Sequence, residues 1–513
     1  MNRIKSIKTK VFLHPMMAII VMIFAVIIAS GILNFFGASA SYNTVNAVTG
    51  NNQSNLVTVE SLFSLRGLKY IFSNTVSNFS SFAPLIMLLI SLIGIGILEE
   101  SGFLATFFFA ITKRAPKYIV TFVLSLLCVI LSISGDVSYV LFIPIAALLF
   151  KHGRRNPLAG IIVSFISISV GFGINLTMSG IDSSLANMTS NAAKIHGIYS
   201  LHSLGFLFIM IVATIASSIL ITYICEKYTI FQLGKYEPDE DEITIDKDRL
   251  TRKEKRGLLF AGTGFVLYAL ILIYNVIPRV PFGGNFLDYS QSRYIDKLFG
   301  ANSFFNSGFI FVITFLFFLI GLLYGLGAKT IEDHRDVCDF LSKSLDGIGK
   351  IIILIFFASI LVSLYKYTNI GQLITAIFST IIFKSNFSGI PLVALVIFVS
   401  IITTIFLPSL TARWEILSGT IVPFLMTSGY TAGFAQLVFT SCGTILYGLT
   451  PIMAYYVIYL SYLDKYDRSG TGVLKSIRYL VPYAFVIMVM WIVLITLWML
   501  VGIPLGVGSG VLL

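Results

Sequence analysis

One carboxylate, Asp136, lies in the middle of one of the most apolar stretches of this chain, residues 118–150. An ionisable side chain at membrane depth is costly and usually faces a cavity or a partner, so we interpret Asp136 as functional. Such a group can bind and release a proton, or it can hold Na⁺ as a metal ligand with help from unwound backbone near Gly173 and Asn175. The alternative is a neutral, hydrogen-bonded carboxyl with a structural role.

A second cluster of polar residues, in the segment LPSLTARWEI, interrupts the apolar run at residues 391–428. Arg413 could attract an anionic substrate, and Trp414 could stack on an aromatic one. Thr411 lies three residues before Trp414, so both side chains would share one helical face. The alternatives are a structural pair between Arg413 and Glu415, and a packing or anchoring role for Trp414.

The sequence gives little support for nucleotide binding, for hydrolysis or for a zinc site. The segment GLGAKT at residues 325–330 has alanine where a phosphate-binding loop requires its second glycine. The serines around Asp136 lack a histidine partner, so an intramembrane hydrolase is not indicated. The four cysteines have no C-x-x-C spacing, which argues against a zinc site. We therefore expect no enzyme, and no cofactor other than Na⁺ or H⁺ as a coupling ion.

The elements that must position these residues are membrane helices. The chain of 513 residues is 57% hydrophobic and 12% charged, whereas soluble proteins carry about 25% charged residues. The net charge of +11 lies mostly in short loops between spans, which indicates cytoplasmic loops rather than a nucleic-acid partner. These basic loops are residues 3–10, 113–117, 151–155, 227–256, 329–350 and 465–478.

The pattern predicts an all-α polytopic membrane protein with a cytoplasmic N-terminus. Residues 227–256 carry charges of both signs and read as a cytoplasmic linker between a first half, 1–226, and a second half, 257–513. We expect nine transmembrane helices, near residues 11–34, 82–112, 157–178, 203–225, 257–278, 307–328, 349–378, 431–462 and 479–503.

Two further apolar segments do not fit as single spans. Residues 118–150 lie between two basic loops on the same side, and splitting them at Ser134-Gly135-Asp136 gives arms of roughly 21–25 Å. The hydrocarbon layer is about 30 Å thick, so we expect a re-entrant helical hairpin with its tip in a cavity. Residues 391–428 are expected to form a second hairpin.

Three landmarks recur in the same order in the two halves. GFLATFFFAI resembles GQLITAIFST, the two hairpins follow, and SVGFGIN then matches SCGTILY, with Gly171 corresponding to Gly443. An odd number of crossings separates the units, so the repeat is inverted. Inverted repeats with broken helices are typical of secondary transporters, although such glycines can also serve close helix packing alone.

The residues of these landmarks resemble one known family. SGDVSYVLFIPIAALLFKHGRRNPLAGIIVSFISISVGFGINL at residues 134–176, together with GILEESGFL, SLTARW and LTPIMAYY, is similar to the p-aminobenzoyl-glutamate transporter (AbgT) family. The resemblance implies a bowl-shaped homodimer in the bacterial inner membrane, with nine spans and two hairpins per subunit. It also implies ion-coupled uptake of folate catabolites, or efflux of sulfonamide-type antimetabolites.

Some functional residues of the family are present in this chain, and others are replaced. The family's hairpin aspartate, serine and tryptophan match Asp136, Thr411 and Trp414. Its Y-R-I-G-D-S motif aligns with residues 439–444, so its arginine has become Thr440 and its aspartate Gly443. Arg413 is then the remaining cation near the site. Our expectation is a secondary active transporter of a small organic solute; the alternatives are a passive channel or facilitator, and a non-transporting membrane receptor on the same scaffold.

Overall fold

The structure is a computed structural model. It describes residues 13–45, 52–113, 115–176, 178–197, 199, 201–202, 204–234, 249–300, 302–304, 308–467 and 470–513. The expected basic loop at residues 3–10 and residues 235–248 of the expected linker lie outside the described residues.

The described part of the chain is mostly helical and has only two short strands, which confirms the all-α polytopic class. Ten helices in it are long and apolar enough to cross a membrane. Two of the ten, Lys117–Ser134 and Gly389–Phe406, are segments that we expected to turn back as arms of hairpins. The number of crossings, nine, therefore stays a prediction.

The first helix is followed by a segment that the hydropathy pattern did not resolve into elements. Helix α1 (Pro15–Phe35) leads into two antiparallel strands, β1 (Ser39–Val45) and β2 (Asn52–Thr58), with Ser39 opposite Thr58. Helix α2 (Leu65–Ser80) then starts at Ser64, whose hydroxyl accepts a hydrogen bond from the Gly67 amide at 3.0 Å.

Two expected spans are each broken into two helices. The span at 82–112 consists of α3 (Ala83–Glu100) and α4 (Phe103–Thr112), separated at Gly102, which has a φ of +85°. The span at 349–378 consists of α16 (Ile348–Thr368) and α17 (Ile370–Lys384), separated at Asn369 with a φ of +59°. Both residues adopt the left-handed conformation that glycine and asparagine tolerate best.

Both expected hairpins appear as helix pairs with a short break. In the first, α5 (Lys117–Leu131) and the 3₁₀ turn η1 (Ser132–Ser134) precede α6 (Val137–His152). In the second, α18 (Gly389–Phe406) precedes α19 (Leu410–Thr427). The arms of the first hairpin have 15 and 16 residues, which at 1.5 Å per residue is roughly 22–24 Å.

Further elements lie between and after these segments. They are α7 (Pro157–Gly171), α8 (Gly180–Ala193), α9 (Leu207–Ile224), the π-helix η2 (Cys225–Thr229), α10 (Ile230–Leu233), α11 (Arg252–Val276), α12 (Tyr294–Phe299), α14 (Phe309–Ala328), α15 (His334–Ser344), α20 (Ala432–Gly443), the 3₁₀ turn η4 (Tyr447–Leu449), α21 (Tyr456–Tyr466) and α22 (Val473–Val501).

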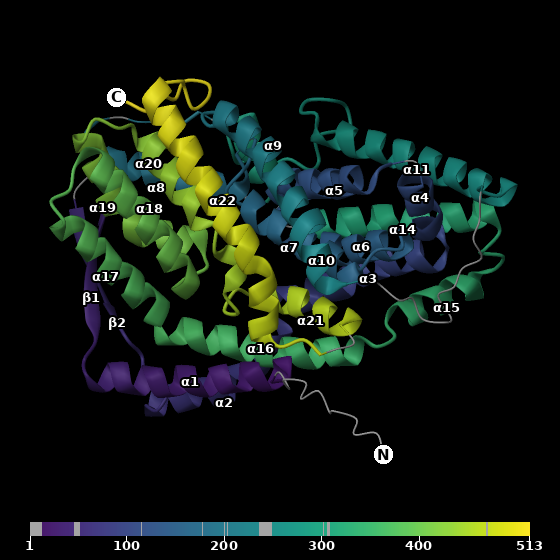
Figure 1. Cartoon of the computed structure of the whole chain (residues 1–513), viewed down its shortest axis with the longest axis horizontal. Helices are drawn as coiled ribbons and strands as arrows, with labels where there is room; N and C mark the ends of the chain where they lie inside the picture. The colour runs from purple at the N-terminus through teal and green to yellow at the C-terminus, as the bar shows by residue number, and fades with distance from the viewer. Residues whose placement is uncertain are drawn as a thin grey trace, which may run out of the picture.

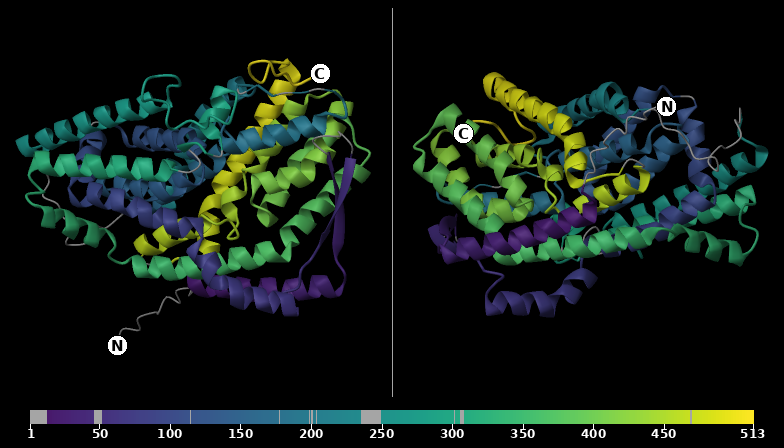
Figure 2. Two further views of the ribbon diagram at one scale, coloured as in Figure 1. Left: turned by 180° about the vertical axis from the view of Figure 1, so that it is seen from behind. Right: turned by 60° about the horizontal axis from the view of Figure 1, so that its bottom comes forward.

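Figure 1 shows how these elements are arranged. Helices α11 and α14 pack side by side at one end with α3, whereas α17 to α20 and α8 gather at the other end beside β1. Helix α22 runs obliquely between the two ends, and α1 lies along α16. The two further views in Figure 2 show the same separation of the two groups of helices.

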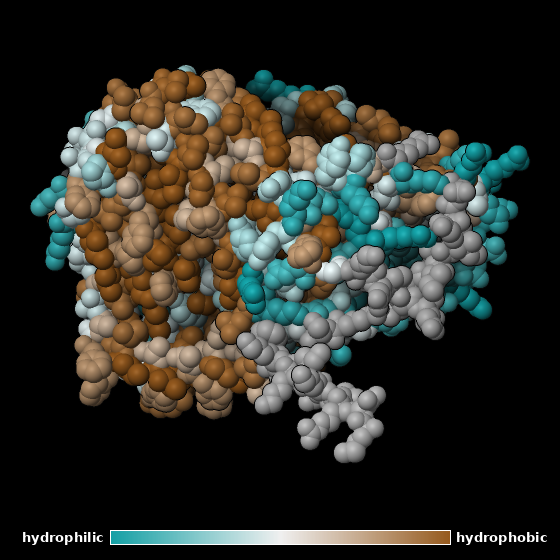
Figure 3. Space-filling model, viewed as in Figure 1, coloured by the Kyte–Doolittle hydropathy of each residue, from teal (hydrophilic) through white to brown (hydrophobic). Residues whose placement is uncertain are grey.

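Helices α7 and α20 lie in the interior of the protein. Every residue of α7 and of α20 is buried, as expected for helices that are apolar on all sides. By contrast, apolar side chains cover most of the outer face over α17 and α22 in Figure 3, and hydrophilic ones gather near α10 and α15. This distribution fits a membrane protein with a lipid-facing belt.

Candidate functional site

The tip of the first hairpin is built from serines and one glycine. Gly135 has a φ of +69° and a ψ of −146°, a conformation open essentially to glycine only. The Ser134 and Ser138 hydroxyls lie 2.8 Å apart, and both donate to the Leu131 carbonyl oxygen, at 2.7 and 2.8 Å. These bonds satisfy the Leu131 carbonyl at the break, and Asp136 lies directly before α6.

Asp136 lies on the wall of an open cavity of about 540 Å³. Tyr455 lines the same cavity, and its hydroxyl donates to the Met87 sulfur at 3.2 Å. Lys366 and Tyr367, from the end of α16, line the same cavity. Tyr70 from α2 also lines it, and its ring stacks on that of Tyr367 with centroids 4.3 Å apart. A carboxylate, an ammonium group and an aromatic pair therefore share one cavity.

The broken ends of α7 and α20 meet behind this tip. A Cβ on Gly171 would lie 2.4 Å from the Ser132 hydroxyl oxygen, and a Cβ on Gly173 would lie 2.3 Å from the Thr444 hydroxyl oxygen. Both distances are too short for a real contact, so both positions require glycine for close approach. The two glycines thus bring hairpin one and α20 against the end of α7.

Arg413 is held inside the second hairpin. Its side chain is fully buried, and its guanidinium donates to the Ser400 carbonyl at 3.0 Å, to the Thr404 hydroxyl at 2.5 Å and to the Gly443 carbonyl at 3.1 Å. It also lies over the Phe439 ring, 5.2 Å from the centroid. The structural pair between Arg413 and Glu415, which was the alternative interpretation, does not form; Glu415 is exposed.

Trp414 is also fully buried. Its indole N–H donates to the Thr189 hydroxyl at 2.9 Å, and Thr189 in turn donates to the Gln436 side-chain oxygen at 2.7 Å. The indole stacks on Phe439 with ring centroids 4.5 Å apart. Trp414 therefore joins hairpin two to α8 and α20, and a contact with solute requires this packing to change. Thr411, one turn earlier, is only partly buried.

A second, smaller cavity collects other expected site residues. Gly173, Asn175 and Thr440 line a space of about 20 Å³ together with Asp182. The Asn175 amide donates to the Asp182 carboxylate at 2.7 Å, and Ser179 donates to the same oxygen. This space is large enough for one water molecule.

The structure thus brings some expected residues together and separates others. Arg413 touches Gly443, and Gly173, Asn175 and Thr440 share one cavity, whereas Asp136 lines a different one. The described residues contain no group of three or more His, Cys, Asp or Glu side chains suited to a metal ion. A Na⁺ site at Asp136 would therefore rely on backbone and hydroxyl oxygens.

Sequence reasoning did not single out several residues of these cavities. Tyr70 and Lys366 come from segments read as a loop and as a helix break, and their meeting depends on how α2 packs on α16. The sequence around Asp182 does contain a local signal for the role of this residue. The spacing S-x-x-D in SGID is that of a capping box, which Ser179 and Asp182 form at the start of α8.

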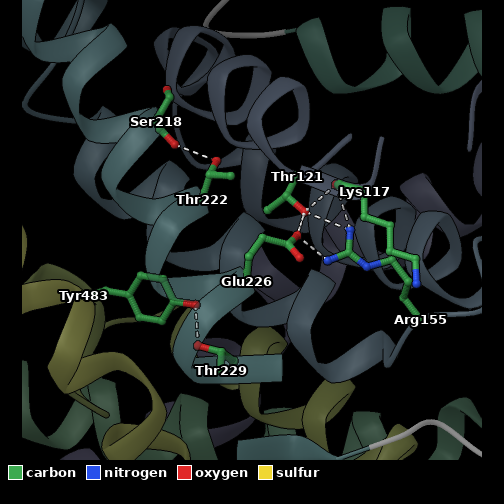
Figure 4. Close-up of polar contacts among 8 residues, drawn as sticks. All are labelled: Lys117, Thr121, Arg155, Ser218, Thr222, Glu226, Thr229 and Tyr483. Atoms are coloured by element: carbon green, nitrogen blue, oxygen red, sulfur yellow. Dashed lines mark hydrogen bonds and ion pairs between the residues drawn. The ribbon is translucent and has the colours of Figure 1, made fainter. Parts of the chain in front are cut away.

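A polar cluster outside both cavities fixes the base of the first hairpin (Figure 4). Arg155 forms an ion pair with Glu226 in the π-helix η2 and donates to the Thr121 hydroxyl at 2.9 Å and the Lys117 carbonyl at 3.1 Å. Thr229, also in η2, lies 2.6 Å from the Tyr483 hydroxyl oxygen. The cluster therefore connects α5, the loop before α7, η2 and α22.

The similarity to known proteins extends along nearly the whole chain. The family model for AbgT putative transporters matches residues 1–513. The p-aminobenzoyl-glutamate transport protein of Escherichia coli (strain K12) is 26% identical over 497 residues, which are 96% of this chain and 94% of that protein.

Two solved structures are also similar. The YdaH transporter of Alcanivorax borkumensis is 23% identical, with a TM-score of 0.48 and coverage of 96% of this chain and 100% of that one. MtrF of Neisseria gonorrhoeae, described with a class of antimetabolite efflux pumps, is 28% identical, with a TM-score of 0.49 and 98% of both chains covered. On the match of the family model along its full length, this chain belongs to the AbgT family of membrane transporters and is not an enzyme.

Proposed function

We propose that this chain is an ion-coupled secondary active transporter of a small organic solute with an aromatic part, and that Asp136 is its coupling carboxylate. The observation that carries the proposal is the place of Asp136: at the break between α5 and α6, on the wall of an open cavity of about 540 Å³. A cation can reach a carboxylate in such a cavity and bind it reversibly.

Coupling requires that solute and ion affect the same moving part. The hairpin tip meets this requirement, because η1 packs on Gly171 of α7 while Asp136 faces the cavity. Binding of H⁺ or Na⁺ at Asp136 removes a net charge from the tip and so changes the cost of burying it when the cavity closes. Ion binding would thereby favour one of the two orientations of the site.

The lining of the cavity favours an aromatic solute. The stacked rings of Tyr70 and Tyr367 offer an aromatic surface, and Lys366 offers a cation in the same cavity. The relative in Escherichia coli is a p-aminobenzoyl-glutamate transport protein, so p-aminobenzoyl-glutamate is the first solute to test and sulfonamides are the second. We further propose a homodimer in the bacterial inner membrane with the N-terminus in the cytoplasm.

Reconstituted proteoliposomes test the proposal. Radiolabelled p-aminobenzoyl-glutamate or a sulfonamide, at equal concentration on both sides, is expected to accumulate on one side only when a Na⁺ or H⁺ gradient is imposed. Collapse of that gradient by an ionophore should stop the accumulation. Flux that only equilibrates the solute, with or without a gradient, would identify a passive facilitator instead; binding without flux would identify a receptor.

A further inference from the structure

We infer that a pocket between the start of α16 and the end of α21 binds a phosphate group. The two helices pack side by side (Figure 1). The pocket between them measures about 460 Å³, and its lining includes Lys350, Ser461 and Lys465. It shares no lining residue with the cavity of Asp136, so the inference goes beyond the proposed function.

The first turn of α16 forms one wall of this pocket. Gly347, Gly349 and Lys350 line it, and no side chain in the described part of the chain caps the helix. A helix leaves its first amide groups without partners, and its dipole places partial positive charge there. A Cβ on Gly347 or Gly349 would meet nothing within 4 Å, so the space beside these amides is open. Phosphate groups bind at helix starts of this kind.

Two lysines add positive charge to the pocket. Lys350 from α16 and Lys465 from α21 line it, together with the carboxylate of Asp464. Among the residues that the structure describes, none places a carboxylate oxygen within 4.0 Å of either ammonium group. Glu99 is near enough to Lys465 for an electrostatic interaction, but too far for an ion pair. Both ammonium groups are therefore available to an anion.

Ser461 is the observation that points to a missing ligand. Its side chain lines the pocket and is only 3% exposed, and its Oγ atom has no hydrogen-bond partner. A buried hydroxyl without a partner is unfavourable. Lysines near the membrane surface are explained by the orientation of the chain in the membrane, whereas that explanation does not apply to Ser461. A phosphate oxygen that accepts from Ser461 would satisfy it.

The mixture of groups indicates the kind of phosphate. Amide, ammonium and hydroxyl donors can each bind a different phosphate oxygen, and lysine is a common phosphate ligand. Asp464 opposes a highly charged anion, and as a pure acceptor it can bind an amine or hydroxyl on the same ligand. A phosphodiester with such a group, as in a phospholipid headgroup, matches the whole set. Inorganic phosphate matches the donors alone.

The position of the pocket separates it from the proposed transport site. Lys366 and Tyr367 lie at the other end of α16, in the cavity of Asp136. Helix α16 has 21 residues, which corresponds to about 30 Å. The pocket instead adjoins the basic segments 329–350 and 465–478, which we propose to be cytoplasmic. Its ligand therefore comes from the membrane surface or from the solution on that side.

Thermal titrations of the purified full-length protein in detergent test the inference. The probes are a short-chain phosphatidylethanolamine, the diacylglycerol with the same chains, inorganic phosphate, and chloride at equal ionic strength. We expect the phospholipid, inorganic phosphate or both to raise the melting temperature, and the two probes without phosphate to leave it unchanged. A response to the phospholipid alone identifies a headgroup site, and a response to inorganic phosphate identifies a soluble ligand. No response to either would overturn the inference.

The decisive comparison is between Gly349→Asp and Gly349→Asn, which differ in charge and hardly in size. Both side chains have open space, and only the aspartate places a negative charge beside the amides of the first turn. The variant Gly349→Asp should bind the stabilising probe at least tenfold more weakly than Gly349→Asn, because one charge-assisted interaction is replaced by repulsion. Equal affinities of these two variants would contradict a site at the start of α16.

Two further variants separate a built site from general attraction to a basic surface. Ser461→Ala should weaken binding of the probe, since the phosphate loses a donor. Lys343→Gln is the control for Lys350→Gln, because Lys343 is exposed in the same basic segment and does not line the pocket. Equal losses of affinity in Lys343→Gln and Lys350→Gln would show general attraction only and overturn the inference. Size-exclusion profiles establish that each variant is folded.

Discussion

Arg413 and Gly443 face each other where hairpin two meets α20. The Arg413 Nη2 atom donates to the Gly443 carbonyl oxygen at 3.1 Å, and a Cβ on Gly443 would lie 3.0 Å from Nη1. The guanidinium fills the space beside Gly443 and, through its further bonds to the Ser400 carbonyl and the Thr404 hydroxyl, ties α20 to both helices of hairpin two.

Trp414 is expected to contribute strongly to stability. Trp414→Ala removes a buried indole and its stack on Phe439, which should destabilise the fold by about 3–5 kcal/mol. Trp414→Phe keeps an aromatic ring and loses the bond to Thr189, which should cost about 1 kcal/mol. Thermal unfolding in detergent measures both changes.

Trp491→Phe is the matched control for Trp414→Phe. Trp491 is equally buried, but its indole N–H has no partner, so the change removes no hydrogen bond. Its melting temperature should fall less than that of Trp414→Phe. A larger fall for Trp491→Phe would contradict the importance of the bond between Trp414 and Thr189.

Loss of the ion pair between Arg155 and Glu226 should lower the stability more than loss of the neutral hydrogen bond between Thr229 and Tyr483. Glu226→Gln leaves Arg155, whose side chain is 7% exposed, without its counter-charge. Because Glu226 is itself 21% exposed, we expect a loss of roughly 2–3 kcal/mol, below the value for a fully buried pair. Tyr483→Phe, which removes the bond to Thr229, should cost about 1 kcal/mol. Equal melting temperatures of the two variants would count against this ranking.

Any substitution of Gly135 is expected to lower the stability because of the backbone conformation alone. A Cβ at Gly135 meets nothing within 4 Å, yet the φ of +69° strains any other residue. Gly135→Ala should therefore cost about 1–3 kcal/mol. Gly349→Ala is the control, since its Cβ also meets nothing and it lies in helix α16 without a positive φ. If both variants melt at the same temperature, the tip does not have this backbone conformation.

The hairpin tip should be accessible from water. In a Cys338→Ser background, which removes the exposed cysteine, Asp136→Cys and Ser81→Cys should both react with a small hydrophilic thiol reagent, because both positions line the open cavity. Ser125→Cys, fully buried and 2.8 Å from the Ser167 hydroxyl, should not react. Labelling of Ser81→Cys without labelling of Asp136→Cys would show that the tip is sealed.

The sequence was informative where polar residues interrupt apolar runs. The breaks near Gly102 and Asn369 and the tip at Asp136 were all visible as glycine, asparagine or charged residues inside hydrophobic segments, and helices end at each of them. Such signals are local, because a helix at membrane depth ends only where its freed backbone groups find other partners.

Contacts between distant segments could not be predicted in this way. Trp414 and Thr189 are 225 positions apart, and nothing in either segment indicates that they meet. The strands β1 and β2 and the helix α2 lie in a stretch that hydropathy marked only as poor in basic residues. Their form depends on packing against α16, α17 and α19, which local pattern does not encode.

The most direct test of the account is ion-driven accumulation by Asp136→Asn. Asparagine keeps the size of the side chain and removes its charge, so the variant should insert and fold. In proteoliposomes with an imposed Na⁺ or H⁺ gradient, we expect wild-type protein to accumulate p-aminobenzoyl-glutamate or a sulfonamide and Asp136→Asn to accumulate neither. Accumulation by Asp136→Asn at the wild-type rate and with the same gradient dependence would contradict the coupling role of Asp136.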